Sequence, residues 1–144
     1  MTESKYGKYL VTELKAPQLT PEAAAKYAEF ARRILRIDET IAPGSFQMSC
    51  SWYLHPNPGN SPEPHRHDCD EIIGFIGNNP EDPSDLGGEV EFWMEDEMHI
   101  INKSCLIFVP KGMKHCPLVV RRADRPIFHF STVTAGQYTQ VKDE

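Results

Sequence analysis

The sequence predicts an all-β domain preceded by an N-terminal arm and one helix. From Ser45 onward, short segments with alternating apolar and polar residues are separated by stretches rich in Pro, Gly, Asn and Asp. The only helical pattern lies before these segments, and no glycine-rich phosphate loop or βαβ pattern follows it. Many short strands after one early helix are typical of an antiparallel sandwich or barrel.

Length and composition place the chain among ordinary globular domains. It has 144 residues, of which 40% are hydrophobic and 25% are charged, so one compact core is expected. The four cysteines form no CxxC pair, which argues against a zinc ribbon and a thioredoxin-type motif. No apolar run approaches the roughly 20 residues of a membrane helix, and the first ten residues contain no signal core. We therefore expect a soluble, cytoplasmic protein with no membrane partner.

We expect residues 1–44 to form the arm and helix, residues 45–135 the barrel and residues 136–144 a C-terminal tail. In the arm, the stretch YLVTEL is a candidate short strand. Thr20 is a suitable N-cap and Pro21 a favoured first residue for a helix that runs to about Leu35. Its apolar side chains recur at spacings of three and four. Such a surface can dock on a sheet or on a second subunit, and an arm strand can extend a partner's sheet, so we expect a homodimer.

The strand pattern is clearest in SFQMSCSWYL, where apolar residues alternate with Ser, Gln or Tyr. Six later segments are also predicted strands: DEIIGFIG, GEVEFWMEDE, MHII, SCLIFVP, HCPLVVRR and PIFHFSTV.

Two histidines in GNSPEPHRHDCDEIIGFIG are placed to bind one ion. In an extended strand, His65 and His67 point to the same side with Cα atoms roughly 7 Å apart. Glu71 has the same parity and supplies a carboxylate, whereas Asp70 would need an irregular backbone to replace it. The orientation of Cys69 depends on whether the DCD sequence bends.

A second segment, VPKGMKH, supplies another candidate ligand. Pro110 and Gly112 predict a turn that brings His115 into the next strand. Three neutral imidazoles and one carboxylate suit a divalent Fe, Mn, Ni, Co or Zn ion and leave coordination positions open in octahedral geometry.

The first of these segments resembles the first signature motif of the cupin superfamily. That motif has Gly, five residues, His-x-His, three or four residues, Glu, six residues and Gly. Here Gly59, His65, His67 and Glu71 match, and Gly77 follows Glu71 after five residues rather than six.

The second segment resembles the second cupin motif, which has Gly, five residues, Pro-x-Gly, two residues, His, three residues and Asn. Pro110, Gly112 and His115 match, while Ser104 replaces the Gly and Val119 replaces the Asn. These departures lie in turns and strand ends, so all four ligand positions stay intact.

The resemblance implies a double-stranded β-helix, or jelly-roll barrel, with a metal inside it. The implied metal ligands are His65, His67, Glu71 and His115. Cupin enzymes include dioxygenases, isomerases, decarboxylases and hydrolases, so we expect a metal-dependent enzyme acting on a small molecule that coordinates the metal through oxygen. The alternative is a non-catalytic module that binds or senses a small ligand through its metal.

Three further residues are candidates for roles beside the metal. His129 is a candidate proton carrier or donor to a ligand, or else a hydrogen-bonded structural histidine. Tyr53 and Gln47 share the polar face of one predicted strand, which either contacts substrate or faces solvent. Cys116 follows a predicted ligand, so strand alternation turns its thiol away from the metal.

The acidic residues are concentrated in one part of the chain. Residues 61–100 contain 12 acidic residues and one basic residue, a net charge of -11, within a total of -6. This segment repels a phosphate backbone, and no helix-turn-helix pattern is present, so nucleic acid is not expected as a partner. Glu71 is assigned to the metal, and most of the remaining acids are expected to be solvated.

Overall fold

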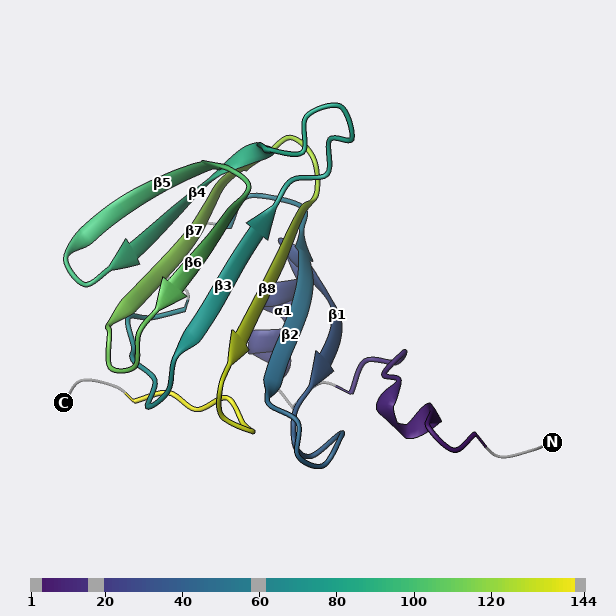
Figure 1. Cartoon of the computed structure of the whole chain (residues 1–144). Coiled ribbons are helices and arrows are strands. Elements are labelled where there is room, and N and C mark those ends of the chain that lie inside the picture. Colours follow the sequence, from purple (N-terminus) through teal and green to yellow (C-terminus); the bar gives the residue numbers. More distant parts are fainter. Residues whose placement is uncertain (1–3, 16–19, 58–61, 142–144) are drawn as a thin grey trace.

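The computed structural model describes residues 4–15, 20–57 and 62–141 and contains two antiparallel sheets that face each other (Figure 1). The first sheet has the strand order β1-β2-β8-β3-β6 and the second has the order β5-β4-β7. The strands are β1 (Ala31–Ile37), β2 (Gln47–Tyr53), β3 (Glu71–Ile76), β4 (Asp85–Met94), β5 (Glu97–Lys103), β6 (Cys105–Val109), β7 (His115–Ala123) and β8 (Ile127–Val133).

The hydrophobic core lies between the two sheets. Phe75 of β3 and Ile127 of β8 meet Val90 and Phe92 of β4 and Val120 of β7, and all five are fully buried. The seven strands predicted after Ser45 are all present, because their alternating side chains fit a sheet with one face on the core. The prediction of an all-β fold is confirmed. No helix in the described residues is long and apolar enough to cross a membrane.

Gly77 shows why a glycine follows β3. A Cβ atom at this position would lie 1.9 Å from the carbonyl oxygen of Asp85, so any side chain would displace the start of β4. The Gly77 amide also donates to the Ser104 hydroxyl, which in turn donates to the carbonyl of Pro83. Ser104, one of the departures from the second motif, thus joins the segments before β4 and β6. Gly59, at the start of the first motif, lies outside the described residues.

The predicted helix is correct at its start and wrong at its end. Helix α1 (Pro21–Ala28) begins with the Thr20 hydroxyl accepting a hydrogen bond from the Ala23 amide. It stops at Ala28, and the residues expected to form its last turns belong to β1, which pairs with β2. Pairing with β2 satisfies the β1 backbone, an interaction between distant segments that outweighs the local helical pattern.

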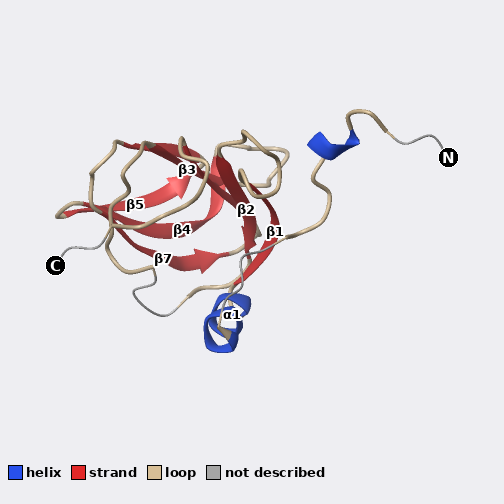
Figure 2. Cartoon of the chain, turned by 90° about the horizontal axis from the view of Figure 1, so that it is seen from below, coloured by secondary structure: helices blue, strands red, loops and turns tan. Residues whose placement is uncertain are grey.

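The helix packs on the barrel at the start of β1 (Figure 2). The Tyr27 hydroxyl lies 2.5 Å from that of Ser51, and the Phe30 ring packs against Tyr53 with centroids 5.4 Å apart. The predicted docking on a sheet therefore uses Tyr27 of α1 and Phe30, which follows the helix.

The predicted strand in the arm does not form. The arm instead contains a short 3₁₀ helix, η1 (Gly7–Tyr9), and residues 10–15 have no strand. The segment lies beside the edge strand β1, where Nε of Arg36 donates to the carbonyl of Lys15, but the described residues of the arm form no backbone pairing with β1. Leu10 is 74% exposed.

Strand β2 alternates as predicted, but its polar set faces the interior. Gln47, Ser51 and Tyr53 are buried, whereas Met48 and Trp52 are only partly buried on the outer face. Of the two orientations left open for Gln47 and Tyr53, the structure shows the inward one, and neither side chain faces solvent.

Candidate metal centre

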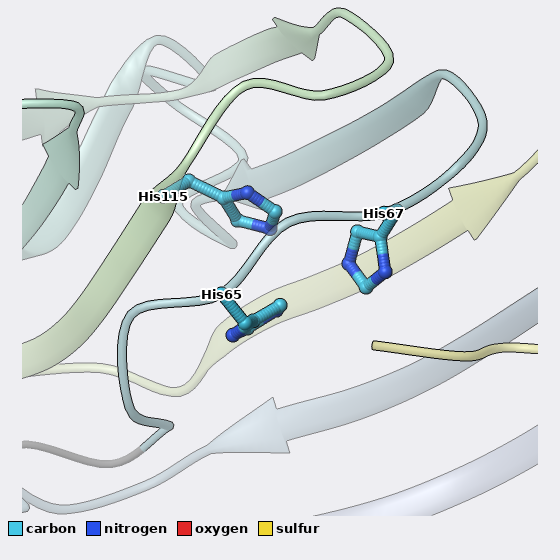
Figure 3. Close-up of side chains that lie close together, drawn as sticks. All are labelled: His65, His67 and His115. Carbon is cyan, nitrogen blue, oxygen red and sulfur yellow. The ribbon is translucent and has the colours of Figure 1, made fainter. Parts of the chain in front are cut away.

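Three buried histidines lie together at one end of the barrel (Figure 3). His65 and His67 lie in the segment before β3, and His115 is the first residue of β7. The backbones of His65 and His115 exchange two hydrogen bonds, of 3.0 and 2.9 Å. This bridge brings together histidines that are 50 residues apart in the chain. His65 and His67, on either side of Arg66, are both buried, as their predicted placement on one side of the chain requires.

The turn before β7 positions His115 as predicted. Gly112 has φ of 84°, which favours glycine, and the Met113 amide donates to the carbonyl of Pro110. The Gly112 amide donates to the carbonyl of His67. The turn is therefore held against the segment that carries the other two histidines.

Each histidine is oriented by a backbone carbonyl. The Nδ1 atoms of His65, His67 and His115 lie 2.6, 2.5 and 3.1 Å from the carbonyl oxygens of residues 63, 139 and 113. A neutral imidazole that donates from Nδ1 presents the lone pair of Nε2 as its ligand. One ring nitrogen from each histidine lies within 4.8 Å of the others.

Glu71 contacts two of the three rings. Its Oε1 atom lies 3.0 Å from Nε2 of His115 and 3.3 Å from Nε2 of His67. Burial raises the pKa of this carboxyl, but interactions with His115 and His67 that require a hydrogen on each Nε2 outweigh burial and lower the pKa to about 2. Glu71 is therefore an anion at neutral pH although it is only 2% exposed.

The donor set fits a metal cation. When the three imidazoles are neutral and donate from Nδ1, their Nε2 atoms carry no hydrogen, so these atoms and the Glu71 carboxylate are all acceptors that face one another. Nε2 of His67 and Oε1 of Glu71 are buried, and no described residue offers either of them a hydrogen-bond partner of acceptable geometry. Buried acceptors in this arrangement cost free energy unless a cation lies among them. Nitrogen and carboxylate donors suit a divalent transition ion.

Tyr138 also lies at this centre, although no sequence pattern indicated it. Its hydroxyl oxygen is 3.3 Å from Nε2 of His65, and its ring centroid is 4.6 Å from that of His67. The next residue, Thr139, supplies the carbonyl that orients His67. Both residues lie in the segment predicted as a tail, where no periodicity or motif marks them.

His129 and Tyr53 form an aromatic stack inside the barrel. Their ring centroids are 4.7 Å apart, and the Phe75 ring lies 5.0 Å from that of His129 and 6.3 Å from that of Tyr53. Nδ1 of His129 hydrogen-bonds with the carbonyl of Gly74, 3.1 Å away, and burial lowers the pKa of His129 to about 4. No hydrogen bond or ring contact of either side chain in the described residues involves a metal-site histidine, which favours the structural role of His129.

Gln47 points inward in the same cross-strand row as Glu71. Gln47 pairs with Val133 of β8, which in turn pairs with Glu71 of β3. Gln47 is 3% exposed, and its Oε1 atom has no hydrogen-bond partner in the described residues. Two residues further along the same face, Ser49 of β2 pairs with Ser131 of β8, and their hydroxyls lie 3.3 Å apart. This part of the inner wall is therefore polar.

Cys116 packs in the hydrophobic core. Its φ of 77° interrupts the alternation of β7 directly after His115. Burial, together with the Glu71 carboxylate, raises the pKa of Cys116. The side chain is therefore a thiol at neutral pH, which makes it a poor nucleophile.

Comparison with family models finds no match, and comparison with curated proteins finds none. Among solved structures, oxalate oxidase in complex with glycolate is similar at a TM-score of 0.58 and 14% identity, over 98% of this chain and 66% of that chain. A recombinant oxalate oxidase gives a TM-score of 0.56 at 14% identity, over 93% of this chain and 63% of that one. This chain thus spans about two thirds of their length, and identities this low show similarity of fold alone.

Proposed function

We propose that this chain, which has the cupin fold, is a metal-dependent enzyme that binds a small organic molecule through oxygen. The ligands of one divalent transition ion are His65, His67, Glu71 and His115. The proposal rests on one observation, which is that buried acceptor atoms converge on one point. Three of them belong to imidazole rings whose orientation is fixed by a contact between Nδ1 and a backbone carbonyl. Four protein ligands leave two positions open in octahedral geometry.

The bound metal would supply Lewis acidity toward a carbonyl, enol or hydroxyl oxygen. The residues of the chain hold that ion in a buried site, with Glu71 as the single anionic ligand. Dioxygenase, isomerase, lyase and hydrolase reactions all use such a site, and the fold does not choose among them.

Charge narrows the proposed ligand to a monoanion. No lysine or arginine is buried in the described residues, and besides Glu71 the only buried carboxylate there belongs to Asp38, which pairs with Arg36. A divalent ion and Glu71 leave one positive charge, which a hydroxy acid or an enolate neutralises. A dianion would leave one negative charge in a site without a cation to balance it.

A non-catalytic binding or sensing module is the second candidate. It is favoured by the placement of His129, which stacks on Tyr53 and Phe75 and hydrogen-bonds with Gly74 rather than with a metal-site residue. Ligand binding without turnover under any metal would favour this module, whereas metal-dependent product formation would favour the enzyme.

The first test is the metal content of protein purified without a histidine tag. We expect one ion per chain in the wild type and in His99→Ala, whose histidine pairs with Glu97 away from the centre. We expect His67→Ala to lose most of its metal. Equal metal content in His67→Ala and the wild type would contradict the site. Activity of each metal-loaded form with and without oxygen would then separate dioxygenase from redox-neutral chemistry.

We also propose that the protein forms a homodimer through the outer face of the five-stranded sheet. Trp52 and Phe128 pack against each other there, with ring centroids 5.4 Å apart. On the same face, Ile72, Leu106 and Phe108 are 41%, 65% and 59% exposed. A continuous apolar surface of this kind is typical of a protein interface.

A further inference from the structure

The segment after β8 crosses the end of the barrel that carries the metal-site histidines (yellow in Figure 1). Its start is held by the carbonyl of Gly136, which accepts a hydrogen bond from the amide of Glu39, 3.1 Å away. Its far end is held by Val141 and Arg66, whose backbones exchange hydrogen bonds of 2.6 and 2.9 Å. Tyr138 lies between these two attachments.

The attachments place the Tyr138 hydroxyl beside the candidate metal position. The hydroxyl oxygen is within hydrogen-bond distance of Nε2 of His65, the atom that serves as the metal ligand. Nδ1 of His65 donates to the carbonyl of Glu63, so Nε2 is an acceptor and the Tyr138 hydroxyl is the donor. The Gln140 amide lies 3.4 Å from the same hydroxyl oxygen and donates to it.

Metal binding removes the acceptor that Tyr138 uses in this arrangement. An ion bound to His65 takes the Nε2 lone pair, so the phenol hydrogen then needs another acceptor. In this arrangement Gln140 presents its Nε2 donor, and not its Oε1 acceptor, to the Tyr138 hydroxyl. An oxygen atom in an open coordination position is an acceptor next to the hydroxyl.

We propose that Tyr138 donates a hydrogen bond to the oxygen ligand in an open position of the metal, and that residues 136–141 hold it there. This inference rests on the proposed metal site and names a further residue that binds its ligand. A hydrogen bond to an anionic oxygen is among the stronger ones, because the acceptor is charged. Tyr138 therefore favours a hydroxy acid or enolate bound through oxygen.

The experiment compares Co(II)-loaded wild type, Tyr138→Phe and Tyr9→Phe. Glycolate is the probe, and its binding is followed by the visible absorption of Co(II). We expect Tyr138→Phe to weaken glycolate binding about tenfold, while its affinity for Co(II) stays within about twofold of the wild type. Tyr9 lies in the exposed η1 helix, so Tyr9→Phe serves as the control and should match the wild type.

The outcomes separate this inference from the proposed function. Equal glycolate affinity in Tyr138→Phe and the wild type would overturn the role of Tyr138 and leave the metal site intact. Failure of the wild type to bind Co(II) would instead overturn the metal site. Co(II) binding without glycolate binding would contradict both the proposed ligand class and the role of Tyr138. A tyrosinate absorption band in the Fe(III) protein that Tyr138→Phe abolishes would show direct coordination and overturn the hydrogen-bonding role.

Discussion

Nδ1 of His67 lies 2.5 Å from the carbonyl oxygen of Thr139, 72 residues later in the chain. This contact fixes which nitrogen of His67 faces the other two histidines, because the donor must be Nδ1. Residues that follow the last barrel strand therefore complete the candidate metal centre.

Deletion of residues 136–144 should weaken metal binding by about 10-fold to 100-fold, the usual effect of removing a partner that orients a ligand. Competition with a coloured chelator measures this affinity. Deletion of residues 1–9 is the control, because η1 lies outside the barrel (Figure 1). Equal affinities of the two deletion proteins would show that Thr139 does not orient His67.

Glu71→Gln should lower metal affinity by about tenfold or more, since the amide keeps the shape of the side chain but removes its charge. Equilibrium dialysis with metal analysis gives the affinity. Glu81→Gln changes an exposed carboxylate in a loop and should have no effect. The role of Glu71 as a ligand would be refuted if both variants bound metal as the wild type does.

His129 should make the fold less stable as pH falls. Its pKa is about 4 in the folded protein and about 6.5 in an unfolded chain. Between these values the unfolded state binds more protons, so the free energy of unfolding falls from pH 6.5 toward pH 4. Urea unfolding of wild type and His129→Phe across this range measures the contribution. We expect the variant to gain stability relative to the wild type as pH falls, and parallel pH profiles would contradict this.

Phe108→Glu should convert the proposed dimer to a monomer, because it puts a charge on the exposed outer face of the five-stranded sheet. Met98→Glu is the control, since Met98 is 44% exposed on β5 of the other sheet. Sedimentation equilibrium reports the mass of each protein. A wild type that stays monomeric at high concentration would rule out this dimer.

The seven strands after Ser45 and the placement of His65 and His67 on one side of the chain were predictable from the sequence, because both depend on spacing along the chain. The proximity of His115 to them was expected from the resemblance to the two cupin motifs, and the backbone bridge between His65 and His115 produces it. Alternation with a period of two places side chains on one face of a strand. The turn at Gly112 places His115 at the first position of β7. The spacing of His65 and His67 likewise defines one side of the chain.

Three features followed only from the tertiary structure: the strand conformation of Ala31–Ile37, the side chains that β2 turns inward and the position of Tyr138. Residues 31–35 continue the helical pattern but belong to strand β1, because pairing with β2 supplies backbone hydrogen bonds that the local sequence does not reveal. The polar side chains of β2 face inward in the register that pairs β2 with β8, and this register places Trp52 against Phe128 on the outer face. Tyr138 reaches the centre because the chain crosses the barrel end after β8. Spacing in the sequence thus determined the ligand pattern, while contacts between distant segments decided what surrounds it.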